Sequence, residues 1–219
     1  MKKVFKKIFS LFKKTEPSRK RIMRKTRGQS FVEFAITLPL LLMLLASVVE
    51  YGFMLNYYLS MLDATRTAAR FYSGLDPFQA DHVTDNMVFY NQVAVMVQDG
   101  MNPLIATPGY VGRTIPLDPL LDDIIVSVYG IEGNTVYSHP DSGPYHFYSN
   151  GVNNSIFNAT NIATTRVAGA PNEGLLVVEI HYKYHQILAL PWLLVLVSNP
   201  VPLQAYTIMP IRAAEPVTP

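Results

Sequence analysis

The sequence predicts an α+β protein in which a long N-terminal transmembrane helix continues as a stem into a small domain built on an antiparallel sheet. Three observations favour this class. A run of about 25 apolar residues lies near the N-terminus, a strongly basic segment precedes it, and a helical pattern followed by several strand patterns occupies the remaining chain. The 219 residues have room for this anchor and one modest domain.

Charge divides the chain into two parts. Residues 1–28 hold twelve basic side chains and one acidic side chain, a net charge of +11, whereas the other 191 residues hold six basic and fifteen acidic ones, a net charge of −9. Because the basic block directly precedes the longest apolar run, the positive-inside rule predicts a cytoplasmic flank, and binding to nucleic acid is not expected. Within it, residues 2–14 form an amphipathic pattern that predicts contact with anionic membrane lipid. This segment either holds the precursor at the membrane or has no further role.

The apolar run from Phe31 to Leu55 is interrupted only by Glu33 and Glu50. Roughly 20 residues suffice to cross a hydrocarbon core of about 30 Å, and the centre of the run is apolar on every face, unlike a surface helix of a soluble domain. We therefore expect one spanning helix, with a cytoplasmic N-terminus and a periplasmic C-terminal domain. Helix-forming residues continue beyond the span, so the helix is expected to end near Tyr72.

The exported part begins with an amphipathic helix over residues 81–99, with Gly100 as its C-cap. Residues 123–138 predict a pair of strands with Gly133 and Asn134 at the turn, and the Ser-, Asn-, Gly- and Pro-rich residues 138–173 predict a long loop region. Three further segments follow. Residues 175–185 alternate as a half-buried strand, and residues 201–212 form a last strand that Pro210 places at an edge. Residues 186–197 are too short to span a bilayer; we expect them in the domain core, the alternative being a patch that touches the membrane or a partner.

The sequence gives little support for catalysis. Cysteine is absent, and no HExxH, GxSxG, phosphate-binding loop or dinucleotide fingerprint occurs, so we expect neither an enzyme nor a cofactor or metal site. His181 and His185 lie on a predicted strand and are expected to face solvent. The pair Asp122-Asp123 is expected in a solvated loop.

The border between the basic block and the apolar run carries a short motif. Gly28 closes the basic block, Gln29 follows, and Glu33 lies five residues after the glycine, already inside the apolar run. This arrangement resembles the site at which prepilin peptidases cut after the glycine. A carboxylate inside a bilayer costs at least about 2.5 kcal/mol if unpaired. We hypothesise that the amine of Gln29, exposed by cleavage, pairs with Glu33 in the same or a neighbouring chain; the alternative is a Glu33 hydrated at the interface.

The wider N-terminal region, residues 27–74, resembles TadE-like proteins. The matching positions are Gly28, Glu33, Phe34, Pro39, the tripeptide Glu50-Tyr51-Gly52 and the alanine-rich segment 64–70. Pro39 is expected to kink or loosen the helix, because it leaves the carbonyl of Ala35 without its helical donor. Glu50 lies 17 residues after Glu33, about 25 Å along a helix, and is expected to be a simple carboxylate at the opposite interface. The C-terminal third also looks like the family, and the middle matches only in its helix followed by strands.

The resemblance implies a minor pseudopilin that acts in the assembly of tight-adherence pili of the Flp type. Its domains are then a leader over 1–28, a transmembrane and stem helix over 29–74, and an exported domain over 75–219. The implied partners are a prepilin peptidase, a Flp-type major pilin and other pseudopilins, inner-membrane Tad platform proteins and a secretion ATPase. Two alternatives remain: an uncleaved, signal-anchored periplasmic binding module, and an anchored hydrolase whose site the acidic loops hide.

Overall fold

The computed structural model describes residues 26–166 and 172–214, so the leader up to residue 25 lies outside the described residues. The chain divides into two units, with the boundary between Ala46 and Ser47. Helix α2 (Thr26–Tyr72) contributes to both and contains Pro39. It ends at Tyr72, as predicted. Among the described residues, one helix, over Gly28–Tyr72, is long and apolar enough to cross a membrane.

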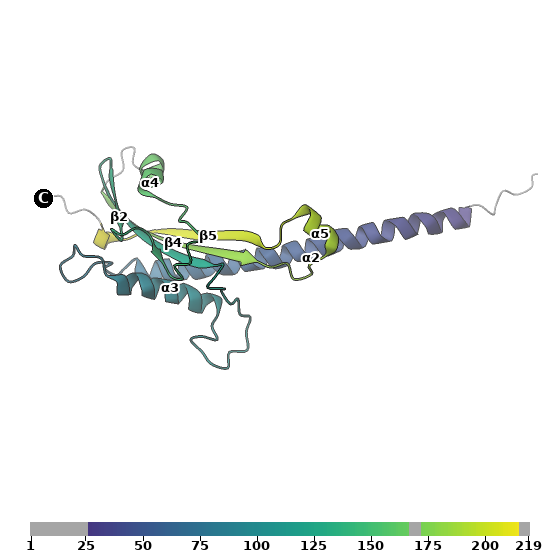
Figure 1. Cartoon of the computed structure of the whole chain (residues 1–219), viewed down its shortest axis with the longest axis horizontal. Helices are drawn as coiled ribbons and strands as arrows, with labels where there is room; N and C mark the ends of the chain where they lie inside the picture. The colour runs from purple at the N-terminus through teal and green to yellow at the C-terminus, as the bar shows by residue number, and fades with distance from the viewer. Residues whose placement is uncertain (1–25, 167–171, 215–219) are drawn as a thin grey trace, which may run out of the picture. The chain divides into compact units, whose positions relative to one another are not determined.

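The second unit is built on an antiparallel sheet with the strand order β2-β1-β4-β5, and β3 pairs with β1 on the same edge as β2. This confirms the α+β class (Figure 1). The strands are β1 (Asp123–Glu132), β2 (Thr135–His139), β3 (Tyr145–His146), β4 (Glu173–Tyr184) and β5 (Val201–Pro210). The predicted β1-β2 pair is present, and Gly133 occupies its turn with φ of 57°, a left-handed conformation that favours glycine. β5 lies at the edge of the sheet, also as predicted.

Strand β4 is buried on both faces, so the prediction of a half-buried strand was wrong. Leu176, Val178 and Ile180 point into the core formed with helices α2 and α3 (Met87–Met101), whereas Leu175 and Val177 belong to a second cluster with helix α4 (Ala159–Arg166). The polar residues that alternate along β4 are therefore covered as well. Strand β3 and helix α4 both lie within the predicted loop region.

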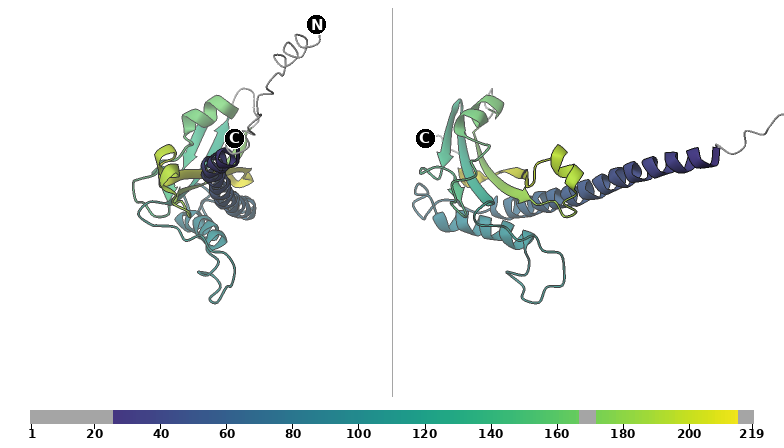
Figure 2. Two further views of the ribbon diagram at one scale, coloured as in Figure 1. Left: turned by 90° about the vertical axis from the view of Figure 1, so that its right-hand side faces the viewer. Right: turned by 45° about the vertical axis from the view of Figure 1, so that its right-hand side comes forward.

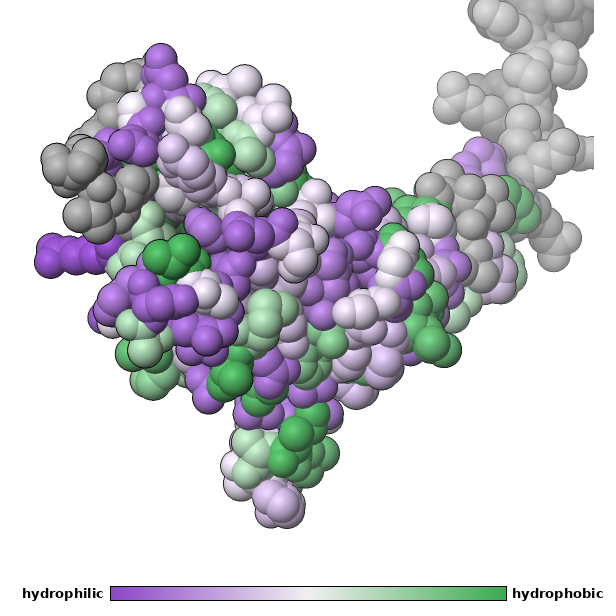
Figure 3. Space-filling view, turned by 60° about the vertical axis from the view of Figure 1, so that its left-hand side comes forward, coloured by the Kyte–Doolittle hydropathy of each residue, from purple (hydrophilic) through white to green (hydrophobic). Residues whose placement is uncertain are grey.

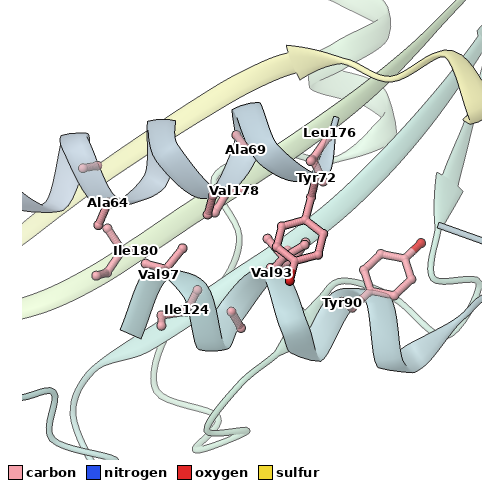
Figure 4. Packing of buried hydrophobic residues seen from close by; sticks show 14 of the residues in the cluster. Ala64, Ala69, Tyr72, Tyr90, Val93, Val97, Ile124, Leu176, Val178 and Ile180 are labelled. Carbon is pink, nitrogen blue, oxygen red and sulfur yellow. The ribbon is translucent and has the colours of Figure 1, made fainter. Parts of the chain in front are cut away.

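The main core forms where the C-terminal half of α2 packs beside α3 on the sheet (Figure 4). Small side chains allow the two helices to approach closely, since a Cβ atom on Gly100 would lie 3.2 Å from the Cβ of Ala64. Buried members include Ala64, Ala69 and Tyr72 of α2, and Tyr90, Val93 and Val97 of α3. The stem of the helix is therefore an integral part of the domain.

Helix α3 differs from its prediction at both ends. Residues 81–86 are not helical, because the Asp81 carboxylate accepts hydrogen bonds from the backbone N–H groups of Val83 and Thr84 and forms a local turn instead. The Thr84 hydroxyl also donates to this carboxylate, and its bond, together with the two backbone bonds, lowers the pKa of Asp81 to about 2. Asn86 then caps the helix by accepting from the N–H of Val88. At the other end Gly100 lies inside the last turn and Asn102 is the C-cap.

The expectation that residues 186–197 lie in the core was also wrong. They form an extended loop and the short helix α5 (Pro191–Leu196), and Ile187, Leu188 and Val197 are exposed. This loop lies beside α2 (Figure 2). A core position is unavailable because α2, α3 and α4 already cover the two faces of the sheet.

Candidate functional site

The predicted processing motif lies in the first turns of α2. The side-chain amide of Gln29 donates a hydrogen bond of 2.9 Å to Oε1 of Glu33, one helical turn further on. Glu33, Phe34 and Pro39 are all exposed. A Cβ atom on Gly28 would meet nothing within 4 Å, so packing among the described residues does not require a glycine there.

Glu50 lies in the second unit and is not the simple carboxylate that the sequence predicts. Its side chain is buried, with 4% of the residue exposed. One carboxylate oxygen accepts from the Tyr184 hydroxyl at 2.6 Å and from the N–H of Ile187 at 2.9 Å, and the other accepts from the N–H of Leu188 at 2.8 Å. A buried carboxylate needs such donors because leaving water is costly. Glu50 therefore ties the loop after β4 to helix α2.

Aromatic side chains extend this contact along α2. The ring of Tyr57 lies 5.1 Å from that of Tyr184 and 5.8 Å from that of Tyr182, and the guanidinium of Arg113 lies 4.2 Å from the Tyr57 ring centroid. Burial, followed by the hydrogen bond to Glu50, raises the pKa of the Tyr184 hydroxyl, which therefore stays a donor. Glu50, Tyr57 and the buried Met61 recur at helical spacing, so one face of α2 is turned to the sheet and its loops.

A second set of polar side chains is buried on the sheet, contrary to the sequence predictions. Asp122 and Asp123 are buried, not solvated: Asp122 accepts from the N–H of Lys183 at 2.7 Å, and Asp123 contacts Nδ1 of His146 at 2.7 Å. His181 is buried too, with its Nε2 atom 3.5 Å from Glu179, whereas His185 is exposed as expected. Segments distant in sequence supply the partners of Asp122 and Asp123, so local spacing carried no signal of these contacts.

Asp85, His139 and Asp141 form a cluster that the sequence analysis missed. Their ligand atoms lie within 4.8 Å of one another, which is close enough for a cation. The Asp85 carboxylate already accepts a hydrogen bond from the N–H of Asp141 at 2.7 Å. Asp85 and His139 are 54 residues apart, so no sequence spacing could indicate the cluster. The hydrogen bond between Asp85 and Asp141 connects the turn before α3 with the residues that follow β2.

A family model described as TadE-like protein matches residues 28–70. The match covers most of α2 and includes Gly28, Glu33, Phe34, Pro39 and Glu50. It confirms the resemblance expected from the sequence and links the chain to tight-adherence pilus systems. Searches of curated proteins and of solved structures returned no match.

Proposed function

We propose that this protein is a minor pseudopilin that takes part in the assembly of tight-adherence pili and is cut by a prepilin peptidase after Gly28. One observation carries the proposal: Gly28 and Glu33 stand five residues apart at the border between a segment of charge +11 and an apolar helix, inside the TadE-like match. Neither the glycine nor the glutamate is specific alone. Their position at this border is what favours a processing signal.

The surroundings of Gly28 support its recognition by the peptidase. Glycine in a helix costs about 1 kcal/mol relative to alanine, and among the described residues no atom occupies the space that a Cβ would take. Packing against those residues therefore gives no reason for glycine at this position. A peptidase that must approach the backbone closely does benefit from a residue without a side chain.

Glu33 is placed to act after cleavage. Cutting after Gly28 makes Gln29 the first residue, and its side chain already lies within hydrogen-bond distance of Glu33. The new α-amine offers a stronger, charged partner, in the same chain or in a neighbouring subunit. Pairing between subunits would favour lateral assembly of the helices in the membrane.

The proposed partners follow from this role. They are membrane lipid, the prepilin peptidase, a Flp-type major pilin and other pseudopilins, the Tad platform proteins and the secretion ATPase. We propose that the N-terminus is cytoplasmic and that the sheet domain lies in the periplasm of a bacterial cell. The protein then contributes no catalysis and no cofactor; it acts through assembly.

Coexpression with a prepilin peptidase, followed by intact-mass measurement, tests the proposal. The expected product begins at Gln29, and Gly28→Ala should block its formation. Gly52→Ala is the matched control, because Gly52 lies in the same helix and its Cβ would also meet nothing within 4 Å. A chain that still begins at Met1, or a Gly28→Ala chain cut at the same bond, would overturn the proposal; the former would favour an anchored periplasmic binding module.

A further inference from the structure

We infer that the loop Ile187–Val197, which contains α5, rests in the interfacial zone of the lipid leaflet where α2 leaves the membrane. This inference deepens the proposed function and rests on one part of it, the membrane-spanning role of α2. The loop is thus a second membrane contact of the protein. It lies about 130 residues after the apolar run ends at Leu55.

The composition of the loop is unusual for a surface in water. Residues 187–197 contain no charged side chain, and Ile187, Leu188 and Val197 are 50%, 38% and 41% exposed. Hydrophilic residues, by contrast, cover much of the face of the sheet domain seen in Figure 3. Contiguous exposed apolar residues indicate a surface that another phase or molecule covers.

The loop is held in one place on α2. Glu50 accepts hydrogen bonds from the N–H groups of Ile187 and Leu188, and the N–H of Gln186 donates to Oδ1 of Asn199 at 3.2 Å, which closes the base of the loop. Beyond Glu50, side chains of the loop and of α2 meet around a small apolar cavity; its lining includes Ser47, Tyr51, Met54, Leu193 and Val197. The loop therefore lies along residues 47–54 of the helix.

The position of the loop on α2 indicates what covers its exposed apolar side chains. Residues 47–54 belong to the C-terminal end of the apolar run, and Val48, Val49 and Tyr51 are exposed there. Lipid that surrounds these side chains must also reach the loop attached to the same turns of helix. A protein partner would have to displace that lipid, so the leaflet is the occupant that the geometry favours.

Polar and aromatic groups lie at the next turn, where a membrane interface is expected. One groove is lined both by the apolar Val49, Phe53 and Ile187 and by Asn56, Tyr57 and Arg113. Tyr and Trp concentrate at membrane interfaces, and Trp192 is the single tryptophan of the chain. The change from apolar to polar lining therefore lies directly beside the loop.

Trp192 allows a direct test in the full chain reconstituted into phosphatidylcholine vesicles. Brominated lipids quench tryptophan only at short range, and bromines near the glycerol end or near the terminal methyl group report different depths. We expect a blue-shifted emission that loses most of its intensity with the shallow bromines and less with the deep ones. Equal emission in brominated and plain vesicles would overturn the inference.

Two reporters in a Trp192→Phe background separate this outcome from a failure of the proposed anchor. Leu41→Trp lies in the apolar run and should be quenched by the deep bromines. Tyr137→Trp lies exposed on β2 and should not be quenched.

Three outcomes are distinguishable. If Leu41→Trp is quenched and Trp192 is not, the membrane-spanning role of α2 is supported and the lipid contact of the loop is excluded. If neither is quenched, the spanning role of α2 fails as well. If Tyr137→Trp is quenched as strongly as Trp192, the domain lies flat on the bilayer and a specific contact through the loop is excluded.

Discussion

At the scale of single residues, the two glutamates of α2 have opposite surroundings. Glu33 is exposed and bonded to a neighbour on its own helix, whereas Glu50 is buried and bonded to a loop 137 and 138 residues away in sequence. Charge-assisted hydrogen bonds are among the stronger polar contacts in proteins, and donors left unpaired in a buried site are costly. The two carboxylates should therefore differ sharply in their effect on stability.

Replacing Glu50 with Ala leaves the Tyr184 hydroxyl and two backbone N–H groups without their acceptor. We expect the free energy of unfolding to fall by about 1–3 kcal/mol. Denaturant unfolding of the detergent-solubilised full chain, followed by Trp192 emission, measures it. Glu33→Ala is the matched control, since it removes an exposed carboxylate from the same helix and should change the free energy by less than about 0.5 kcal/mol. Equal effects of the two substitutions would contradict the role assigned to Glu50.

Asp122 should make the stability of the domain depend on pH. Burial raises the pKa of its carboxyl above the ordinary value of 3.8, although the N–H groups of Asp118 and Lys183 oppose the rise. The folded state then binds a proton more readily than the unfolded state. Stability from this group is consequently present at low pH and is lost as the pH rises from about 3.8 through the raised pKa.

The variant Asp122→Asn cannot titrate at this position, so it should lack the loss of stability that Asp122 causes as the pH rises. The difference in unfolding free energy between the natural chain and the variant, measured from pH 3 to pH 7 (roughly the window in which a carboxyl with a raised pKa titrates), isolates the contribution of Asp122. We expect the natural chain to lose stability relative to the variant as the pH rises. A constant or opposite difference would show that hydrogen bonds, not burial, dominate at this site.

At the scale of elements, the contact between α2 and α3 depends on small side chains. Ala64 is buried where α3 passes, and a Cβ atom on Gly100 would lie only 3.2 Å from the Cβ of Ala64. Close packing of this kind leaves no room for extra methyl groups, because native interiors are already filled. The two helices can stay at this distance only while both positions remain small.

Replacing Ala64 with Leu should therefore destabilise the domain by about 1–3 kcal/mol through overpacking. The same denaturant measurement tests it. Leu59→Ala, which alters an exposed position of the same helix, serves as the control and should have little effect. If Ala64→Leu were as mild as this control, the helices would not be in close contact at Ala64.

Most elements could be predicted from the sequence, because their signals are local. The end of α2 at Tyr72, the β1-β2 pair and the edge strand β5 follow from apolar periodicity and turn residues. The prediction failed where a local side-chain bond competed with the helix, at Asp81 before α3. It also failed for β4, because a loop before α4 covers the second face of this strand: the buried Glu179 accepts hydrogen bonds from the Ser155 hydroxyl and the N–H of Ile156.

At the scale of the whole molecule, the proposed role depends on assembly with other subunits. The substitution Glu33→Leu removes the carboxylate that the amine of Gln29 would pair with but leaves Gly28 and the apolar run intact. We expect cleavage to continue and surface pili to be lost or much reduced. Intact mass reports cleavage, and counts of surface fibres in the native host report assembly.

The natural chain expressed at the same level provides the control for that experiment. Reduced cleavage in Glu33→Leu would place the glutamate in peptidase recognition instead of assembly. Fibres at the natural level would dismiss the pairing of Glu33 with the new N-terminus.

Neighbouring residues are enough to specify the apolar helix, the basic segment before it, the motif at Gly28 and Glu33 and the succession of helix and strands. They do not specify that Glu50, Asp122, Asp123 and His181 are buried, or that residues 187–197 lie outside the core against α2; these features appear only in the folded chain. The reason is physical: a carboxylate or an apolar loop is stable in either setting, depending on donors and surfaces that distant segments bring to it.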